Sequence, residues 1–160
     1  MPAWSRKALA IAQNLGELRS LCDTGFALAV HIRYTRPTLL YQTYAREWTD
    51  RYNEKGYMLA DPTVHWGLAN TGAMDWAMLE NQDPEGVIAA AKGFGLTNGW
   101  TYATGPATSR SLGSMTCSRS FTAEERARIC SIIDFIHTET EGFDSLSAAQ
   151  QETLRNVALN

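Results

Sequence analysis

The sequence predicts a mixed α/β domain in which an α/β/α sandwich surrounds a mainly antiparallel sheet of about five strands. Three observations lead to this prediction. With 160 residues, 44% of them hydrophobic and 19% charged, the chain has the length and composition of one ordinary globular domain. Apolar residues recur at helical spacing near both ends of the chain. Between these ends, short runs typical of strands occur in two pairs, each of which fits a hairpin.

The first part of the chain is expected to form a helix followed by two strands. Residues 4–22 carry apolar side chains at steps of three and four, the spacing of one helical face. These apolar residues are Trp4, Ala8, Ile11, Leu15, Leu18 and Cys22. An apolar and aromatic run over 26–34 predicts a strand that Pro37 ends, and a second strand is expected over 39–44.

Short helices are expected next. The segment 45–53 has a helical pattern. Asp61 followed by Pro62 is typical of a helix start, because aspartate caps the first backbone N–H groups and proline fits the first helical position. This helix is expected to run to about Asn70, with Gly72 closing the segment.

A further helix is expected before the second pair of strands. Pro84 is predicted to open this helix, which stops near Gly95. Strands are expected over 99–104 and 111–118, joined by a loop rich in Gly, Pro, Ser and Thr. The loop lacks the lysine and the following helix of a phosphate-binding loop, so we interpret it as a hairpin connection.

The last long helix has the clearest pattern. Thr122 and Glu125 have the spacing of a capping box, and Gly142 lies where a helix commonly ends. The apolar stripe of this helix consists of Ile129, Ile132, Ile133 and Ile136. Strand pairs with helices on both sides predict a sandwich of the PAS or GAF type, which is a shape typical of sensor domains.

Composition and charge argue against several function classes. A net charge of −3, with basic residues scattered along the chain, is unlike that of a domain that binds DNA by itself. No apolar run approaches the length of a membrane span, and the N-terminus lacks a signal-peptide pattern. Cys22, Cys117 and Cys130 form no CxxC pair and are expected to be reduced thiols. We therefore expect a cytoplasmic protein with no membrane partner.

The sequence contains no recognisable catalytic or metal-binding pattern. The GxSxG, HExxH, GxxxxGK[ST] and GxGxxG motifs are all absent. His31, His65 and His137 do not have metal-ligand spacing, and we interpret them as packing or solvated residues. We expect a protein that is not an enzyme and that needs no metal or cofactor.

A set of aromatic residues with one acid is the strongest functional candidate. Its members are Tyr44, Trp48, Tyr52, Asp61 and Trp76. Tyrosine and tryptophan combine a large apolar body with one polar group, so they can line a pocket and hydrogen-bond its occupant. Such a set suits a small, mostly apolar ligand whose polar head carries an N–H and carbonyls. From residue types alone, the aromatic residues also fit an ordinary core, and Asp61 also fits a simple helix cap.

The spacing of these residues resembles that of the autoinducer-binding domains of LuxR-type quorum-sensing transcription regulators. In the family's core motif, Y-x3-W-x3-Y is followed after eight residues by D-P, as in residues 44–62. Downstream, Trp76 matches the family's second tryptophan, residues 94–99 match its FGL-xx-G turn, and residues 112–116 resemble its LGxLS/T strand. The resemblance covers about residues 5–140.

This resemblance implies a ligand, an N-acyl-homoserine lactone in a buried pocket, and a role for each site residue. Trp48 would donate its indole N–H to the lactone carbonyl, and Asp61 would accept the ligand's amide N–H. Tyr44 would donate to the amide carbonyl, with help from Thr116. Gly99 would be structural. Further contacts to the head group and acyl chain would come from Tyr52, Val64 and Trp76.

The neighbours of Val64 depart from the family pattern. Thr63, His65 and Trp66 stand where smaller or aliphatic residues are expected. The length and oxidation of the acyl chain therefore stay open, and so does the class of ligand.

The end of the chain resembles a second module of the same family. Residues 146–160 are similar to the opening of its helix-turn-helix DNA-binding domain, LTxREx-EVLxxxAxG, although they also fit a generic amphipathic helix. The expected organisation is an autoinducer-binding domain over 1–143, followed over 144–160 by a linker and the start of a helix-turn-helix domain.

The resemblance leaves more than one function open. The chain could be the ligand-sensing domain of a regulator that forms a homodimer, with the helix over 122–140 contributing, and contacts DNA only through a domain missing from this chain. It could instead be a naturally short family member that binds and inhibits a full-length regulator, or a receptor for a different small molecule.

Overall fold

The structure, a computed structural model, describes residues 2–157 and contains one antiparallel sheet. The five strands are β1 (Gly25–Arg33), β2 (Arg36–Gln42), β3 (Gly72–Asp75), β4 (Trp100–Thr104) and β5 (Arg110–Thr116). Their order in the sheet is β2-β1-β5-β4-β3, and every neighbouring pair is antiparallel. The predicted fold class, mixed α/β around an antiparallel sheet of five strands, is confirmed.

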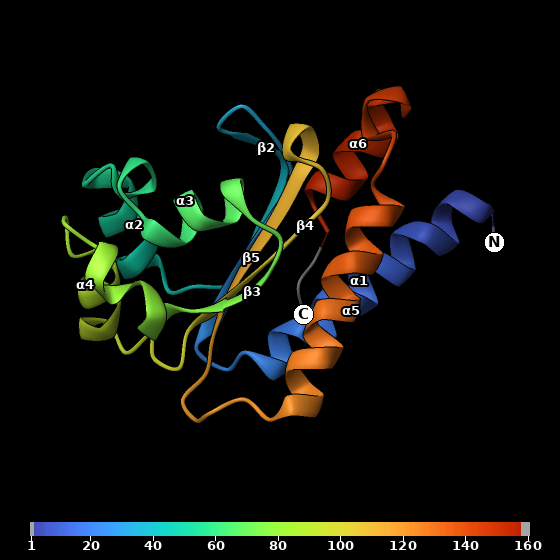
Figure 1. The fold of residues 1–160 in the computed structure, drawn as a ribbon. Helices are drawn as coiled ribbons and strands as arrows, with labels where there is room; N and C mark the ends of the chain where they lie inside the picture. The colour runs from blue at the N-terminus through green and yellow to red at the C-terminus, as the bar shows by residue number, and fades with distance from the viewer. Residues whose placement is uncertain (1, 158–160) are drawn as a thin grey trace.

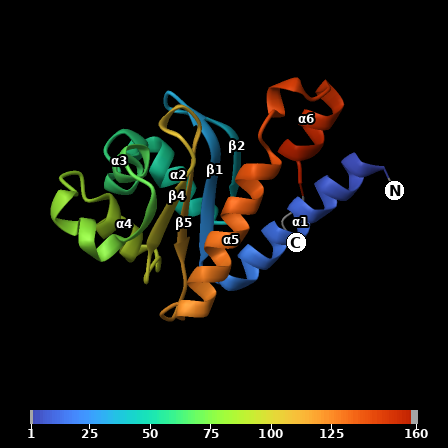
Figure 2. The ribbon, with the colours of Figure 1, turned by 45° about the vertical axis from the view of Figure 1, so that its right-hand side comes forward.

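Helices cover both faces of this sheet (Figures 1 and 2). One face carries α1 (Ala3–Leu21), α5 (Ala123–Glu139) and α6 (Ala148–Arg155). The other face carries α2 (Arg46–Glu54), α3 (Pro62–Ala69) and α4 (Val87–Gly93). Short 3-10 helices connect these elements: η1 (Tyr57–Leu59), η2 (Trp76–Gln82), η3 (Ala107–Ser109) and η4 (Phe143–Ser145). The molecule is therefore the expected three-layer sandwich.

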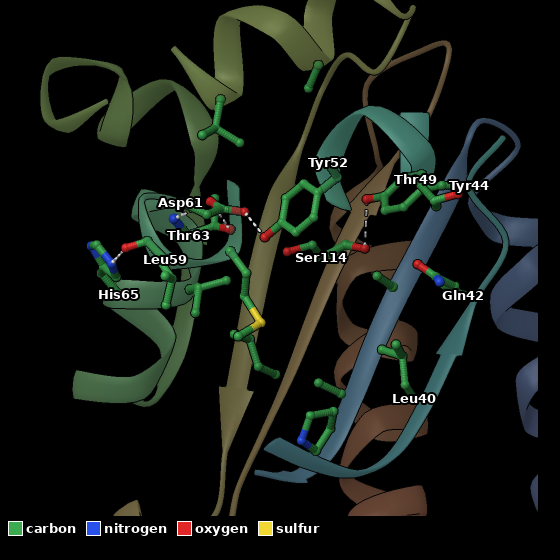
Figure 3. A pocket seen from close by; sticks show the side chains of 18 of the residues that line it. Leu40, Gln42, Tyr44, Thr49, Tyr52, Leu59, Asp61, Thr63, His65 and Ser114 are labelled. Atoms are coloured by element: carbon green, nitrogen blue, oxygen red, sulfur yellow. Dashed lines mark hydrogen bonds between the residues drawn. The ribbon is translucent and has the colours of Figure 1, made fainter. Parts of the chain in front are cut away.

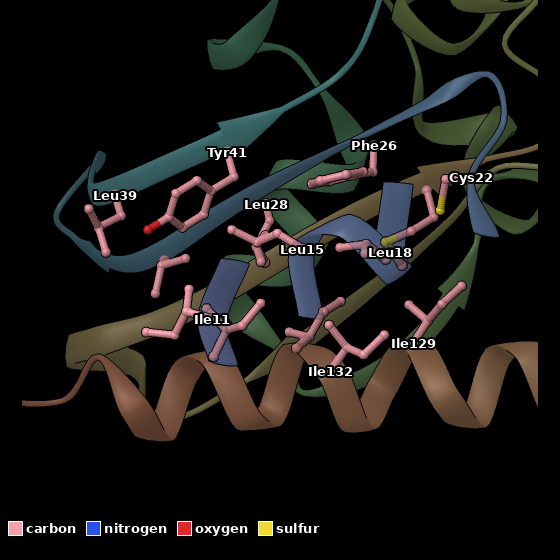
Figure 4. Close-up of a cluster of buried hydrophobic side chains, with 14 of the residues drawn as sticks. Ile11, Leu15, Leu18, Cys22, Phe26, Leu28, Leu39, Tyr41, Ile129 and Ile132 are labelled. Carbon is pink, nitrogen blue, oxygen red and sulfur yellow. The ribbon is translucent and has the colours of Figure 1, made fainter. Parts of the chain in front are cut away.

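The main hydrophobic core lies between the sheet and the α1–α5 layer (Figure 4). Alternate residues of β1, namely Phe26, Leu28 and Val30, belong to this core, because successive side chains of a strand point to opposite faces. The apolar stripe of α5 packs into the same core, and all of its members are buried: Ile129, Ile132, Ile133 and Ile136. These isoleucines face inward and do not form a contact surface for a second copy.

Two helices, α5 and α3, begin at the residues that the sequence predicts. Thr122 Oγ1 accepts a hydrogen bond from the backbone N–H of Glu125, and the Glu125 side chain accepts one from the N–H of Thr122, so the capping box of α5 is present. At α3, the Asp61 side chain caps the helix and Pro62 occupies the first position. Both predictions are confirmed.

Three elements differ from the expectation. β2 begins at Arg36 and contains Pro37, which the sequence pattern places outside a strand; β2 is an edge strand, where a missing N–H is tolerated. The sequence does not predict β3, whose four residues form a short second edge beside β4. The helix expected from Pro84 begins instead at Val87, because the Asp83 carboxylate accepts hydrogen bonds from the first N–H groups of α4.

A bulge in β1 positions one wall residue of the site. The pairing of β1 with β5 shifts register between Ala29 and Ile32, and His31 within the bulge has a φ of 50°. Because of this shift, Ile32 leaves the face of Val30. It lies instead on the face of Ala27 and Ala29, toward α3.

Candidate functional site

A cavity of about 410 Å³ lies between the sheet and the layer of α2, α3 and α4 (Figure 3). On the sheet side its walls include Ala27, Ala29, Ile32, Leu40, Gln42, Leu112 and Ser114. On the helix side they include Trp48, Tyr52, Val64, Leu68, Val87 and Ile88. Among the described lining residues, Asp61 is the only acidic or basic side chain apart from His65. The cavity is therefore largely apolar with one charged point.

Most of the site residues expected from the sequence meet in this cavity. It is lined by Tyr44, Trp48, Tyr52, Asp61, Val64 and Trp76. Thr116 does not line it. The Thr116 hydroxyl is fully buried and donates to the carbonyl of Gly25 at 3.0 Å, while Thr24 Oγ1 donates to it at 2.8 Å. Thr116 thus ties the end of β5 to the start of β1.

Asp61 is a buried acceptor held on both oxygens. It is 7% exposed. Its Oδ1 accepts from the Thr63 backbone N–H at 2.9 Å and from the Thr63 hydroxyl at 2.7 Å, and its Oδ2 accepts from the Tyr52 hydroxyl at 2.8 Å (Figure 3). These donors and the N-terminus of α3 offset the cost of burying the negative charge. The carboxylate is fixed at the cavity wall with room for a further donor.

Trp48 lies at the centre of an aromatic cluster. Its ring centroid is 5.8 Å from that of Tyr52, 6.0 Å from that of Tyr57 and 5.4 Å from that of Phe94. Within residues 2–157, the indole N–H of Trp48 donates to no acceptor. Because Trp48 lines the cavity, this N–H is accessible to an occupant.

Two tyrosine hydroxyls near Asp61 remain protonated at neutral pH. Tyr44 donates to the backbone carbonyl of Ser114 at 3.1 Å (Figure 3). Burial raises the pKa of Tyr44 well above its ordinary value. Burial also raises the pKa of Tyr52, and the nearby Asp61 carboxylate raises it further. Both side chains therefore act as neutral hydrogen-bond donors.

The ring of Trp76 forms part of the cavity wall, and its indole N–H is hydrogen-bonded within the protein. The indole Nε1 donates to Thr101 Oγ1 at 3.1 Å, and Thr101 Oγ1 lies 3.0 Å from Ser114 Oγ. The ring packs directly on Gly99, where an added Cβ would lie 2.2 Å from Trp76 Cδ2. Gly99 is therefore required by close packing.

The histidines take other roles. The rings of His31 and His137 stack with centroids 4.3 Å apart, and both are buried. His31 Nδ1 lies 2.7 Å from Ser109 Oγ, and His137 Nδ1 lies 2.6 Å from Ser111 Oγ. In the described part of the chain, no group of three or more His, Cys, Asp or Glu residues could hold a metal ion.

None of the helices within residues 2–157 has the length and apolar character that a membrane span requires.

Several contributors to the site are not predicted by the sequence. Tyr57 of η1 packs against both Trp48 and Tyr52. The lining also includes Thr35, Pro37, Leu40, Met58, Leu59 and Leu68. These residues carry no chemical pattern of their own, so only the pairing of β1 with β2 and the placement of η1 reveal them.

Comparison with known proteins gives one family match. Residues 20–139 match the model of the autoinducer binding domain. Comparison with curated protein sequences gives no match.

Solved structures share the fold at low sequence identity. SdiA in complex with octanoyl-rac-glycerol has a TM-score of 0.63 and 17% identity, with 90% of this chain and 62% of that chain covered. A crystal structure of Escherichia coli SdiA has a TM-score of 0.63 and 18% identity, with coverage of 90% and 63%. CepR2 from Burkholderia cenocepacia, described as an N-acylhomoserine lactone dependent LuxR family transcription factor, has a TM-score of 0.55 and 14% identity, with coverage of 94% and 99%. The chain thus spans less than two thirds of the length of the two SdiA chains.

Proposed function

Because the chain belongs to the autoinducer-binding domain family, as its sequence motifs indicated, we propose that its cavity encloses an N-acyl-homoserine lactone. The observation that carries this proposal is the polar end of the cavity. There the cavity is lined by one buried acceptor, Asp61, and by Trp48, whose indole N–H has no acceptor within the described residues. The remaining walls are mostly apolar, as an acyl chain requires.

The polar end matches the groups of a lactone head. Asp61 accepts the ligand's amide N–H, and Trp48 donates to the lactone carbonyl. Tyr44, a neutral donor at the same end, turns toward the amide carbonyl. Tyr52 orients Asp61 through its hydrogen bond. Val64 and Trp76 form walls of the cavity. Thr116 does not contact the ligand and supports the strand end beside Gly25.

The role is binding rather than catalysis. Asp61 is committed to hydrogen bonds from Tyr52 and Thr63, so it is poorly placed to take a proton from a nucleophile. His65, the one histidine in the described cavity lining, donates from Nε2 to the carbonyl of Leu59 at 2.7 Å. No metal or cofactor takes part in the proposal, and the small molecule is a signal.

The bound state is read out by a DNA-binding domain outside this chain. CepR2 is described as a transcription factor, which is the same kind of protein that the sequence motifs implied. The chain's own charge of −3 does not suit direct DNA binding. We place the protein in the cytoplasm, where such a regulator meets DNA.

Pairing of two copies is also part of the proposal, although the isoleucine stripe of α5 is not its basis. Those isoleucines are buried within one chain. Light scattering at micromolar concentration, with and without ligand, measures the mass directly. A monomer under both conditions would remove dimerisation by this domain from the proposal.

An acylglycerol is the second candidate ligand. SdiA, which shares this fold, is described in complex with octanoyl-rac-glycerol. Such a ligand has the same apolar tail but offers hydroxyl and ester groups in place of the lactone amide. Asp61 would then accept from a hydroxyl group.

Thermal unfolding with matched ligands tests the proposal. A ligand that binds only the folded state adds about 2.7 kcal/mol at a hundredfold excess over Kd, and this raises the Tm of a domain of this size by roughly 5–10 °C. N-decanoyl-homoserine lactone should give this shift, and free homoserine lactone should not. A shift with decanoylglycerol alone would select the second candidate. Mass spectrometry of ligand extracted from the purified protein identifies the natural occupant.

A further inference from the structure

We infer that the cavity takes lactones with long acyl chains, of about ten to twelve carbons or more, whose methyl end lies in an open apolar mouth. The mouth is the end of the cavity at the β1–β2 turn, where Thr35 and Pro37 line it next to Leu40. This inference rests on the proposed function, and it specifies the chain length that the residues around Val64 left open.

The strand register gives the direction of the cavity. Moving along β2 away from Tyr44, the lining residues are Gln42, Leu40 and Pro37. On the neighbouring β1, Ala27 pairs with Gln42, Ala29 pairs with Leu40, and Ile32 pairs with Pro37. All of these residues line the cavity, so it runs along the β1–β2 hairpin from the polar end toward the hairpin turn.

The length of this path matches a long hydrocarbon chain. At about 3.3 Å per strand residue, the five steps from Gln42 to Pro37 span roughly 16 Å. An extended carbon chain advances about 1.3 Å per bond, because each C–C bond of about 1.5 Å is inclined to the chain axis. The path therefore accommodates roughly twelve carbons beyond the head group.

The walls along this path favour hydrocarbon. Ala27 and Ala29 leave space for a ligand on the sheet side of the cavity, because each side chain is only a methyl group. Val64 and Leu68 of α3 line the cavity from the helix side, and Ile32 is turned onto this face by the β1 bulge. Apart from Asp61 at the polar end, the described lining of the cavity contains no Lys, Arg, Asp or Glu.

The far end of the cavity is open and apolar. Thr35 is exposed, Pro37 is half-buried and Leu40 is 51% exposed, although all three line the cavity. On the helix side of the cavity, Met58 is 39% exposed and Leu59 is 74% exposed, so the rim is apolar there too. Exposed apolar side chains at a cavity rim leave water when a hydrocarbon tail covers them.

An open mouth has a distinct signature in a chain-length series. Each methylene that leaves water inside the cavity raises affinity by about fourfold. Once the chain reaches the mouth, additional carbons enter solvent, so affinity levels off. A closed cavity would instead give an optimum followed by a fall, because surplus methylenes overpack its end.

The experiment is a calorimetric titration of the purified protein with N-acyl-homoserine lactones of four to fourteen carbons. We expect affinity to rise steadily to ten or twelve carbons and then to change by less than about twofold per added pair of carbons. A maximum at six or eight carbons, followed by a decline, would overturn the inference and leave the proposed function intact. Absence of binding at every length would overturn the proposed function itself.

Mouth variants give an independent readout. Leu40→Gln and Pro37→Ser should weaken the twelve-carbon lactone by about threefold to tenfold and change the six-carbon lactone by less than about twofold. Leu9→Gln is the matched control, because Leu9 is a leucine that is 47% exposed, lies on α1 and does not line the cavity. It should change neither affinity. Equal weakening of both lactones by the mouth variants would overturn the inference.

Discussion

Tyr52 and Asp61 form a hydrogen bond at the polar end of the cavity, with the Tyr52 hydroxyl 2.8 Å from Asp61 Oδ2. The two residues come from α2 and from the start of α3, and both line the cavity. Thr63 holds the other carboxylate oxygen. The carboxylate therefore has a defined orientation without a ligand, which reduces the ordering cost of binding.

Replacement of Tyr52 by phenylalanine tests this orientation. Tyr52→Phe removes one hydrogen bond to a buried carboxylate but keeps the ring that packs on Trp48. We expect lactone affinity to fall about fivefold to tenfold, which corresponds to about 1–1.4 kcal/mol. Tyr102→Phe is the control, because the Tyr102 hydroxyl donates to Asp134 on the other face of the sheet. Equal affinity of wild type and Tyr52→Phe in calorimetry would show that Asp61 needs no help from Tyr52.

Asp61 itself should carry more of the binding energy. Asp61→Asn replaces a charged acceptor with a neutral one, and a hydrogen bond to a charged group is worth about 1.5–3 kcal/mol. We expect at least tenfold weaker lactone binding in a domain that remains folded, because the asparagine oxygen can still cap α3. Calorimetry measures the affinity, and circular dichroism checks the fold. An unchanged Kd would rule Asp61 out as the amide acceptor.

The elements that the sequence predicted correctly are those determined by their own residues. The capping box of Thr122 and Glu125 starts α5, and the Asp61–Pro62 pair starts α3, through contacts within a few positions. β3 could not be found this way. Its residues have little strand pattern, and it exists because β4 offers a free edge to which it can pair. Pro37 likewise fits β2 only because β2 is an edge strand.

The residues of the candidate site likewise fall into two groups: those that a local sequence pattern predicts and those that only the tertiary structure brings together. Tyr44, Trp48 and Asp61 could be selected because their chemistry and spacing are distinctive. Leu40 and Leu59 have no such pattern, and both line the cavity only because the fold brings β2 and η1 to it. The orientation of Ile32 depends on a bulge that simple strand alternation would not predict.

Stability should decrease as the pH falls from about 7 to 5. Burial lowers the pKa of His137 below its ordinary value of about 6.5, and the adjacent His31 lowers it further. Below that value the unfolded chain takes up a proton that the folded chain does not, so the free energy of unfolding falls with pH. The carboxylate of Glu125, whose pKa is held at about 2 by Arg119, affects stability only at more acidic pH.

Urea unfolding at several pH values measures this effect. His137→Gln should be less stable at pH 7, because the hydrogen bond with Ser111 changes, yet it should show a smaller loss of stability from pH 7 to 5. Parallel pH profiles for wild type and variant would assign the acid sensitivity to other groups.

Gly99 lies behind the cavity wall that Trp76 forms, and Gly99→Ala should be one of the most damaging small substitutions near the site. The added Cβ would lie 2.2 Å from two ring carbons of Trp76, and that ring is held by its hydrogen bond to Thr101. Relief of this clash requires the ring to move into the cavity or β4 to shift, which costs about 1–3 kcal/mol and lowers the Tm by roughly 3–10 °C. Gly93→Ala is the matched control, because an added Cβ at Gly93 in α4 would have no heavy atom of the described residues within 4 Å, and alanine favours a helix. Its Tm should be equal to or slightly above that of the wild type. If differential scanning calorimetry gave the same Tm for both variants, Trp76 would have to be free to move, and its role as a fixed wall of the ligand cavity would be wrong.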